Sequence, residues 1–211
     1  MCNKPLFAAG LLLVLLALFG VGGSNAEIDG GRVCGINGRN YESKEAAEKD
    51  GTHVLHCGEC GACSNVHDIL IYNSTRNNLT VTTRECAYLY LFPGRWAAKA
   101  CMQSRVGFTD ECLECWLDNI ECDTHTCVWV CIWENIIHWG SHFDENNPCI
   151  ACDENNCGKP FIQCAGANRR RAGIKSDIDR AGDEVCAIAD WELAVLKQQH
   201  EASGGAVLSE Q

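Results

Sequence analysis

Apolar residues follow three different patterns along the 211 residues of this chain. From Pro5 to Gly23 they form an almost unbroken run. Between residues 82 and 139 they recur every three to four positions, which is the spacing of amphipathic helices. The stretches on either side of this central region are polar and contain many Gly and Cys residues. The pattern predicts a mainly helical core with irregular, cysteine-rich flanks.

Cap and break signals divide the central region into helices. Thr82-x-x-Glu85 has the form of a capping box, and Pro93-Gly94 interrupts the chain before a further helical stretch. The pattern then predicts two helices, over 109–121 and 124–139. The second is apolar on every side, which is typical of a central buried helix, although the β-branched residues between 128 and 132 also allow a strand.

These last two helices are expected to pack as an antiparallel hairpin. Residues that face each other across such a turn have nearly constant index sums. Cys112 with Cys131 and Cys115 with Cys127 meet this condition, and their spacing places the two cysteines of each helix on one face. The hairpin hypothesis therefore predicts these two disulfides and leaves Cys122 to bond with another segment.

The apolar run near the N-terminus has the features of a secretory signal peptide. A short polar head with Lys4 precedes it, and Ser24-Asn25-Ala26 supplies the small residues that signal peptidase recognises, so cleavage is expected after Ala26. An uncleaved membrane anchor is the alternative. Because the segment contains one Lys and no acid, its loss changes the formal net charge from −11 to −12, which disfavours binding to nucleic acid.

The cysteine content indicates an oxidising compartment. Of the 17 cysteines, all but Cys2 lie beyond the signal peptide, which leaves an even number at a density typical of secreted disulfide scaffolds. We therefore expect full pairing in disulfides and an extracellular location. Asn73-Ser74-Thr75 and Asn78-Leu79-Thr80 are then candidate N-glycosylation sites at Asn73 and Asn78, in an exposed loop.

The polar stretch before Cys57 predicts a turn or hairpin over 35–41, one short helix within 42–50 and a return strand near 52–55. It also resembles the second half of a Kazal-type module over residues 33–57. The resemblance rests on Val33-Cys34-Gly35-Ile36-Asn37-Gly38-Arg39-Asn40-Tyr41-Glu42-Ser43, which is similar to the family signature V-C-G-x-D/N-G-x-T-Y-x-N/S.

Departures from the Kazal pattern change what the resemblance implies. Glu45 stands where the family has its fourth cysteine, the helix supplies no fifth, and only seven residues separate the cleavage site from Cys34. Cys34 and Cys57 then correspond to the third-to-sixth bridge of the family. The family's protease-binding loop lies before the position of Cys34, where this chain has no such segment. The resemblance implies a Kazal-like fold remnant that does not inhibit proteases.

Other chemistry of the cysteines is disfavoured by the expected compartment. Three thiols at positions 57, 60 and 63 have the residue types of a cluster site, and His138 and His142 with Cys149 and Cys152 have those of a zinc site. Both sites need reduced thiolates, which secretion disfavours. The Cys57-Gly58-Glu59-Cys60 pair lacks the βαβ setting of a thiol oxidoreductase. We therefore predict no metal and no cofactor.

Catalytic signatures are also missing from the sequence. It contains no G-x-S-x-G elbow, no H-E-x-x-H pair and no phosphate-binding loop, and its acids are scattered. We predict no catalytic residues and a protein that is not an enzyme. The basic run Arg169-Arg170-Arg171 is a candidate for binding a polyanion, with a solvated or internally paired cluster and a proprotein-processing site as the alternatives.

Together these observations predict a small, disulfide-rich, mainly α protein that is secreted and acts by binding or as a structural component. Its partner would be an extracellular protein or glycan, with no membrane span after signal cleavage. A Kazal-type serine protease inhibitor and a saposin-like lipid or membrane binder are the alternatives. The expected order is a signal peptide (1–26), a Kazal-like segment (27–57), a helical Cys-rich core (58–140), a Cys-rich C-terminal region (141–200) and a disordered tail (201–211).

Overall fold

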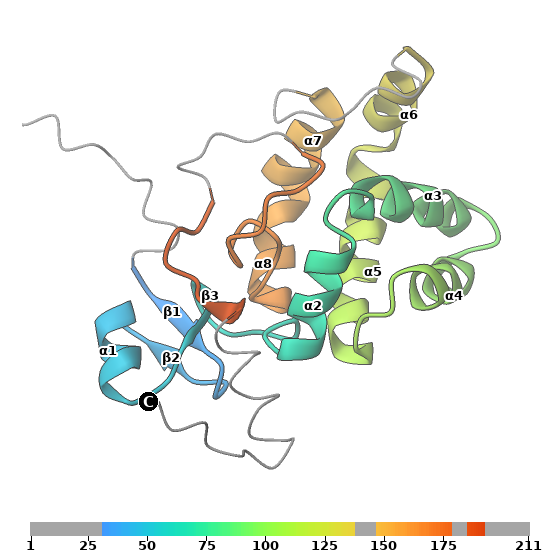
Figure 1. The fold of residues 1–211 in the computed structure, drawn as a ribbon. Helices are drawn as coiled ribbons and strands as arrows, with labels where there is room; N and C mark the ends of the chain where they lie inside the picture. The colour runs from blue at the N-terminus through green and yellow to red at the C-terminus, as the bar shows by residue number, and fades with distance from the viewer. Residues whose placement is uncertain (1–30, 138–146, 179–184, 193–211) are drawn as a thin grey trace, which may run out of the picture.

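The computed structural model describes residues 31–137, 147–178 and 185–192 (Figure 1). The predicted signal peptide and C-terminal tail lie outside these residues. The described chain is mainly helical with one small sheet, and its cysteines from Cys34 to Cys186 are joined in eight disulfides. The predicted fold class, small, disulfide-rich and mainly α, is confirmed. No helix in this part of the chain combines the length and apolar character that crossing a membrane requires.

The N-terminal segment forms an antiparallel sheet of order β2-β1-β3, with one helix between the second and third strands: β1 (Val33–Gly35), β2 (Asn40–Tyr41), α1 (Lys44–Lys49) and β3 (Val54–Cys57). Ser43 caps α1 by accepting a hydrogen bond from the backbone N–H of Ala46. Val33, Ala47 and Val54 form a small core of their own. The hairpin, the short helix and the return strand are therefore present where the sequence predicts them.

The disulfide implied between Cys34 and Cys57 is wrong. Cys34 is bonded to Cys60, and Cys57 is bonded to Cys186. In the pairing of β1 with β3, Cys34 lies opposite His56, one position away from Cys57. Because successive side chains of a strand point to opposite faces of the sheet, the two sulfur atoms lie on opposite faces.

Helices make up most of the remaining described chain: α2 (Val66–Ser74), α3 (Leu79–Leu91), α4 (Arg95–Arg105), α5 (Asp110–Thr126), α6 (Val128–Ile137), α7 (Pro148–Asp153), the π-helical turn η1 (Glu154–Gly158) and α8 (Lys159–Ala165). The predicted break at Pro93-Gly94 separates α3 from α4, and the Cys86–Cys101 disulfide joins these two helices. Residues 128–132 belong to α6, so the alternative of a strand there is wrong.

The predicted hairpin of 109–121 with 124–139 is also wrong, and with it the Cys112–Cys131 and Cys115–Cys127 pairs. Backbone hydrogen bonds from Cys127 N to Asp123 O (2.8 Å) and from Cys131 N to Cys127 O (2.9 Å) continue the helical pattern from α5 into α6. The chain around this junction contains neither Gly nor Pro. A reversal needs such a break, so α6 extends beyond the end of α5 (Figure 1).

The true antiparallel partner of α5 and α6 is the stretch from α7 through η1 to α8, in a region predicted to be irregular. Four disulfides connect these two helical arms, and we call them the ladder: Cys115–Cys164, Cys122–Cys157, Cys127–Cys152 and Cys131–Cys149. The residue numbers of each pair add to 279 in three bridges and to 280 in the fourth. Nearly constant sums of residue numbers therefore do identify the facing cysteines. The facing segments are the two arms of the ladder and not the predicted hairpin.

Helical irregularities keep the ladder cysteines on facing sides. An interval of five residues rotates a side chain about 140° away from its predecessor on a regular α-helix. Each arm contains one such interval, from Cys122 to Cys127 and from Cys152 to Cys157. The first includes the junction between α5 and α6, and the second contains η1. Because a π-turn winds less per residue, it returns Cys157 towards the opposite arm.

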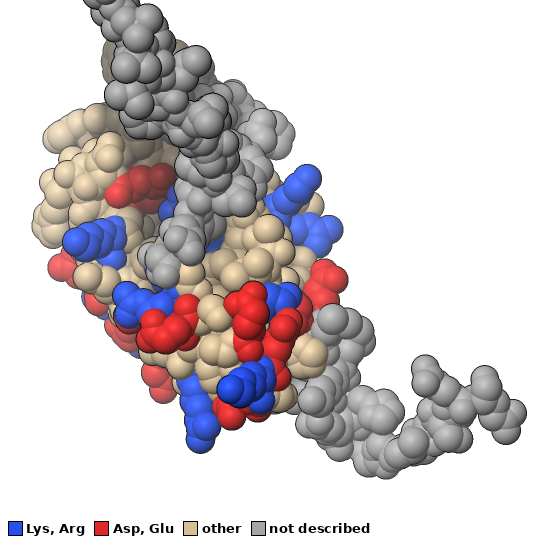
Figure 2. Space-filling view, turned by 90° about the vertical axis from the view of Figure 1, so that its left-hand side faces the viewer, with Lys and Arg blue, Asp and Glu red and all other residues tan. Residues whose placement is uncertain are grey.

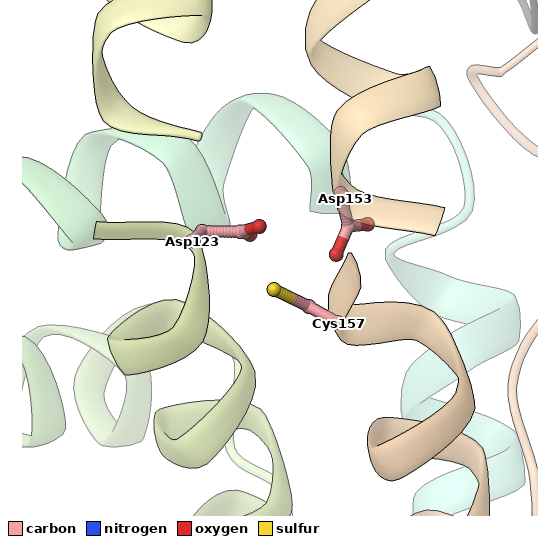
Figure 3. A group of neighbouring side chains, drawn as sticks. All are labelled: Asp123, Asp153 and Cys157. Carbon is pink, nitrogen blue, oxygen red and sulfur yellow. The ribbon is translucent and has the colours of Figure 1, made fainter. Parts of the chain in front are cut away.

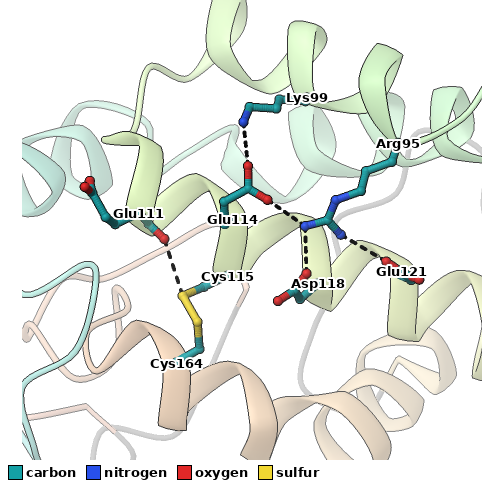
Figure 4. Close-up of polar contacts among 8 residues, drawn as sticks. All are labelled: Arg95, Lys99, Glu111, Glu114, Cys115, Asp118, Glu121 and Cys164. Atoms are coloured by element: carbon teal, nitrogen blue, oxygen red, sulfur yellow. Dashed lines mark hydrogen bonds and ion pairs between the residues drawn. A yellow bond between two sulfur atoms is a disulfide. The ribbon is translucent and has the colours of Figure 1, made fainter.

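An ion-pair network attaches α4 to the exposed side of α5 (Figure 4). The guanidinium group of Arg95 binds Glu114 and Asp118 at 2.7 Å and Glu121 at 3.0 Å, while Lys99 binds the second oxygen of Glu114. Partial burial disfavours the charge on Arg95, but hydrogen bonds to Glu114 and Asp118 outweigh it and raise its pKa. The hydrogen bonds from Lys99 and Arg95 lower the pKa of Glu114. Arg95 and Glu114 therefore stay ionised at neutral pH.

Buried and half-buried aromatic side chains fill the space between α2, α5 and α8. Trp116 stacks on Phe108 with ring centroids 5.7 Å apart and meets Phe161 edge-on at 4.8 Å. Its indole Nε1–H donates to the hydroxyl of Tyr72 (3.1 Å), which in turn donates to Ala167 O. Burial raises the pKa of Tyr72, so this hydroxyl remains protonated. The cluster holds the side of α5 that bears Trp116 in one position.

Peptide mapping under non-reducing conditions should recover the four ladder bridges. The expected products join a peptide from residues 115–131 to one from residues 149–164, because the two arms lie antiparallel with facing cysteines. Fragments that join Cys112 to Cys131 or Cys115 to Cys127 would contradict the ladder and restore the hairpin.

Candidate functional site

The three arginines proposed to bind a polyanion do not form one exposed patch. Arg169 and Arg171 are buried, because the turn after α8 packs between the sheet and the helices. Arg169 forms an ion pair with Asp177 and donates to Thr80 Oγ1 (3.0 Å), and Arg171 donates to Gly166 O (2.8 Å). The alternative interpretation, internal pairing, is correct for these two residues.

The face that carries the sheet and α1 shows no separation of charge by sign (Figure 2). Basic and acidic side chains lie next to one another there, and the ion pairs Arg39–Asp50 and Lys44–Glu48 join some of them. Neither this face nor the arginine turn offers a uniformly positive surface to a polyanion.

The two glycosylation candidates lie on either side of the turn between α2 and α3. Asn73 is the penultimate residue of α2 and is half-buried, and its side-chain oxygen accepts a hydrogen bond from Arg76 (2.8 Å). Asn78 is exposed at the start of α3 and makes no side-chain cap bond there. Asn78 thus has the more open position, and glycosylation of both residues stays a prediction.

The thiols considered as metal or redox groups are all oxidised. Cys57, Cys60 and Cys63 are bonded to three different partners, Cys186, Cys34 and Cys112. Cys149 and Cys152 belong to the ladder, and His138 and His142 lie outside the described residues. These sulfur atoms cannot act as thiolate ligands while the disulfides are intact.

A cavity of about 170 Å³ lies between α3, α5, α6 and α7. Apolar side chains from all four helices form most of its wall, among them Ala87, Leu91, Ile120, Val128, Ile132 and Ile150. Trp116 connects this wall to the aromatic cluster, and the Cys131–Cys149 disulfide forms part of the wall itself. Covalent and aromatic contacts therefore support the shape of the cavity without a ligand.

Three of the polar residues that line the cavity, Asn119, Asp123 and Asp153, lie close together, and we call them its polar base. Asn119 and Asp123 are four residues apart on α5, and Asp153 ends α7. The side-chain amide of Asn119 donates to Asp153 (3.1 Å) and to Asp123 (3.4 Å). Asp123 extends from α5 towards Asp153, and the carboxyl group of Asp153 lies opposite it, above the sulfur of Cys157 (Figure 3).

Burial and the proximity of Asp153 change the protonation of Asp123. Burial, followed by the charge and hydrogen bond of Asp153, raises the pKa of Asp123 to about 8. At neutral pH the pair therefore retains one proton between its two members. The sulfur of Cys157 lies close to both carboxyl groups, but its bond to Cys122 prevents it from completing a metal site.

Unsatisfied polar atoms are concentrated in this cavity. In the described part of the chain, four buried side-chain oxygens have no hydrogen-bond partner. Three of them belong to residues that line the cavity: Thr83 Oγ1, Asn119 Oδ1 and Asp123 Oδ1. Buried polar atoms without partners are rare in folded proteins, so three in one cavity mark it as the candidate functional site. The sequence offered no local signal for it.

A second surface feature is the apolar face of α6. Trp129, Trp133 and Ile136 share one side of the helix at intervals of four and three residues. Their side chains are 80%, 62% and 64% exposed. The sequence predicted a buried central helix here, and that prediction is wrong because α6 extends past the core and contacts mainly α7 along one side (Figure 1).

Replacing Asp123 with Asn should change how stability depends on pH. Between about pH 4 and 8 the folded wild type keeps a proton that the unfolded chain has lost, so its free energy of unfolding falls as pH rises. In Asp123→Asn this contribution is absent. We expect equal stability near pH 4 and a more stable variant at pH 8, measured by urea unfolding with intact disulfides.

Asp118→Asn is the matched control for that measurement, since it makes the same change on the exposed side of the same helix. Its free energy of unfolding should depend on pH in the same way as that of wild type. A difference between Asp123→Asn and wild type that stays constant from pH 4 to pH 8 would contradict the shared proton.

Comparison with known protein families finds one match. A family of unknown function (DUF8771) matches residues 95–188, which include both arms of the ladder and the residues at the base of the cavity. Comparisons with curated proteins and with solved structures find no match. Over this part the chain is similar to a family without a described function, so its function is inferred from the site.

Proposed function

We propose that this chain is a secreted, disulfide-stapled extracellular protein that acts by binding and not by catalysis. The predicted signal peptide and the eight disulfides support this location. The cavity between α3, α5, α6 and α7 is the observation that carries the binding function. Its ligand is a small, largely apolar molecule.

The size and lining of the cavity define this ligand class. An apolar cavity of about 150 Å³ in another protein is large enough to bind benzene. The cavity here measures about 170 Å³, so it accepts a group of one aromatic ring or an aliphatic group of similar size. Apolar walls with a few polar atoms at one end are typical of sites for small organic ligands.

The N-terminal segment serves as a structural part in this proposal. Its resemblance to a Kazal-type module supports a small sheet with one helix, and the resemblance lacks the protease-binding loop. Cys57 joins this segment to Cys186, and the backbone N–H of Cys57 donates to Arg171 O (2.9 Å). These contacts connect the segment to the turn that follows α8, so it supports the helical core.

A ring-sized probe tests the proposed cavity. Indole should bind the disulfide-intact protein with a Kd of about 0.1–1 mM, because so small a ligand has few atoms with which to gain affinity. Ala87→Phe places a ring in the cavity from α3 and should abolish this binding, measured by saturation-transfer NMR.

Ala100→Phe provides the matched control, because Ala100 is exposed on α4 and does not line the cavity. It should leave indole binding unchanged. The proposed function fails if indole does not bind wild type or binds Ala87→Phe equally well.

The exposed face of α6 supports a second candidate, a lipid or membrane binder. Tryptophan side chains favour the interface between water and lipid, and an exposed apolar helix face inserts there. The only charged residue of α6, Glu134, is buried, so electrostatic attraction to anionic lipid is not required.

Flotation with vesicles of neutral phosphatidylcholine tests this second candidate. If α6 inserts, wild type should float with the vesicles, and Trp129→Ala should reduce the bound fraction several-fold. Trp96→Ala removes a similarly exposed tryptophan from α4 and should have little effect. Equal losses in both variants, or no flotation of wild type, would contradict insertion through α6.

A further inference from the structure

Two oxygen acceptors of residues that line the cavity, on Asn119 and Asp123, have no hydrogen-bond partner among the described residues. Asn119 is nine-tenths buried, and its Oδ1 has no partner although its amide nitrogen is fully used by Asp123 and Asp153. Asp123 Oδ1 lies on the same helix face one turn later and is also unpartnered. Thr83 on α3 also lines the cavity, and its unpartnered hydroxyl can donate as well as accept. A ligand that satisfies the two acceptors must bring at least two donors.

From this arrangement we propose that the cavity selects an apolar, ring-sized ligand that carries a protonated amine, with the ammonium group bound by Asp123 and Asn119. This inference rests on the proposed function, because it specifies the ligand of the same cavity. A primary ammonium group offers three donors, whereas a hydroxyl group offers one. A carboxylate or phosphate brings only acceptors and would be repelled by the carboxyl pair.

Charged groups around the base agree with a cationic ligand. Asp153 faces Asp123 from α7, and Arg84 and Arg169 line the cavity from α3 and from the turn after α8. Arg169 forms an ion pair with Asp177, so its charge is balanced within the protein. The causes that shift the pKa of Asp123 are burial and its contact with Asp153, and neither guanidinium group is among them.

Binding of the ammonium group is coupled to loss of the shared proton. In the free protein at neutral pH the carboxyl pair retains one proton. An ammonium group favours the ionised form of Asp123, because that form accepts its hydrogen bonds and carries the opposite charge. Affinity for the amine should therefore rise from pH 6 to pH 8, by up to about tenfold per pH unit. A neutral ligand of the same shape should show no such rise.

Three probes with a common phenyl ring separate these possibilities: 2-phenylethylamine, 2-phenylethanol and 3-phenylpropionate. We expect wild type at pH 8 to bind the amine at least about tenfold more tightly than the alcohol, and to bind the carboxylate most weakly. Calorimetry in two buffers of different ionisation enthalpy should show release of up to one proton with the amine only.

Asp123→Asn should bind the amine and the alcohol with affinities within about threefold of each other, because the neutral amide has lost the charge but keeps the shape. Binding of the alcohol to this variant reports that the cavity has folded correctly. Asp118→Asn, on the exposed side of α5, should keep the preference of wild type for the amine.

The outcomes distinguish this inference from the function on which it rests. If none of the probes binds wild type, the cavity is not a ligand site and the proposed function fails. If the alcohol binds but the amine binds no more tightly at pH 8, the proposed function stands and the ammonium inference is overturned. A preference for the amine that persists in Asp123→Asn would also overturn it.

Discussion

The ladder of four disulfides between two antiparallel helical arms is the constraint on which the rest of this structure depends. One arm is α5 with α6, and the other runs from α7 through η1 to α8. α7 alone has six residues, too few for a stable isolated helix in water. The bridges limit the freedom of the unfolded chain and keep these short helices paired. Two walls of the cavity and the exposed face of α6 are positioned by the ladder.

The ladder also explains how two carboxyl groups can face each other at the base of the cavity. Asp123 follows Cys122 in the sequence, and Asp153 follows Cys152, so bridges adjoin both carboxyl groups. These disulfides prevent the two arms from separating. Such a movement would otherwise relieve the repulsion between the two carboxyl groups and return water to them. Proteins tolerate such locally unfavourable groups mainly at functional sites, where the remaining structure compensates for them. The disulfides between the arms therefore allow the cavity to keep polar groups that lack hydrogen-bond partners.

Several of the arginines that the structure describes are paired with acids of the same molecule. Arg95 holds three acids on α5, and Arg169 is buried against Asp177. Because the chain has an excess of acids, a guanidinium group usually finds an internal partner before it can form a basic surface. This explains why an arginine cluster that is prominent in the sequence is largely buried and paired within the protein.

The sequence by itself determined the features whose signals are local. These include the even number of cysteines, the break at Pro93-Gly94, the N-terminal hairpin and helix, and the helical character of the centre. The pairing of cysteines was decided only by the tertiary structure, because it depends on which helix lies opposite. The intervals 7, 5 and 4 along one arm and 7, 5 and 3 backwards along the other are visible in the sequence, but many other cysteine pairings compete with them. Asp123 and Asp153 are 30 residues apart and have no local signature, since the chemistry of a carboxyl group depends on the neighbours that folding brings to it.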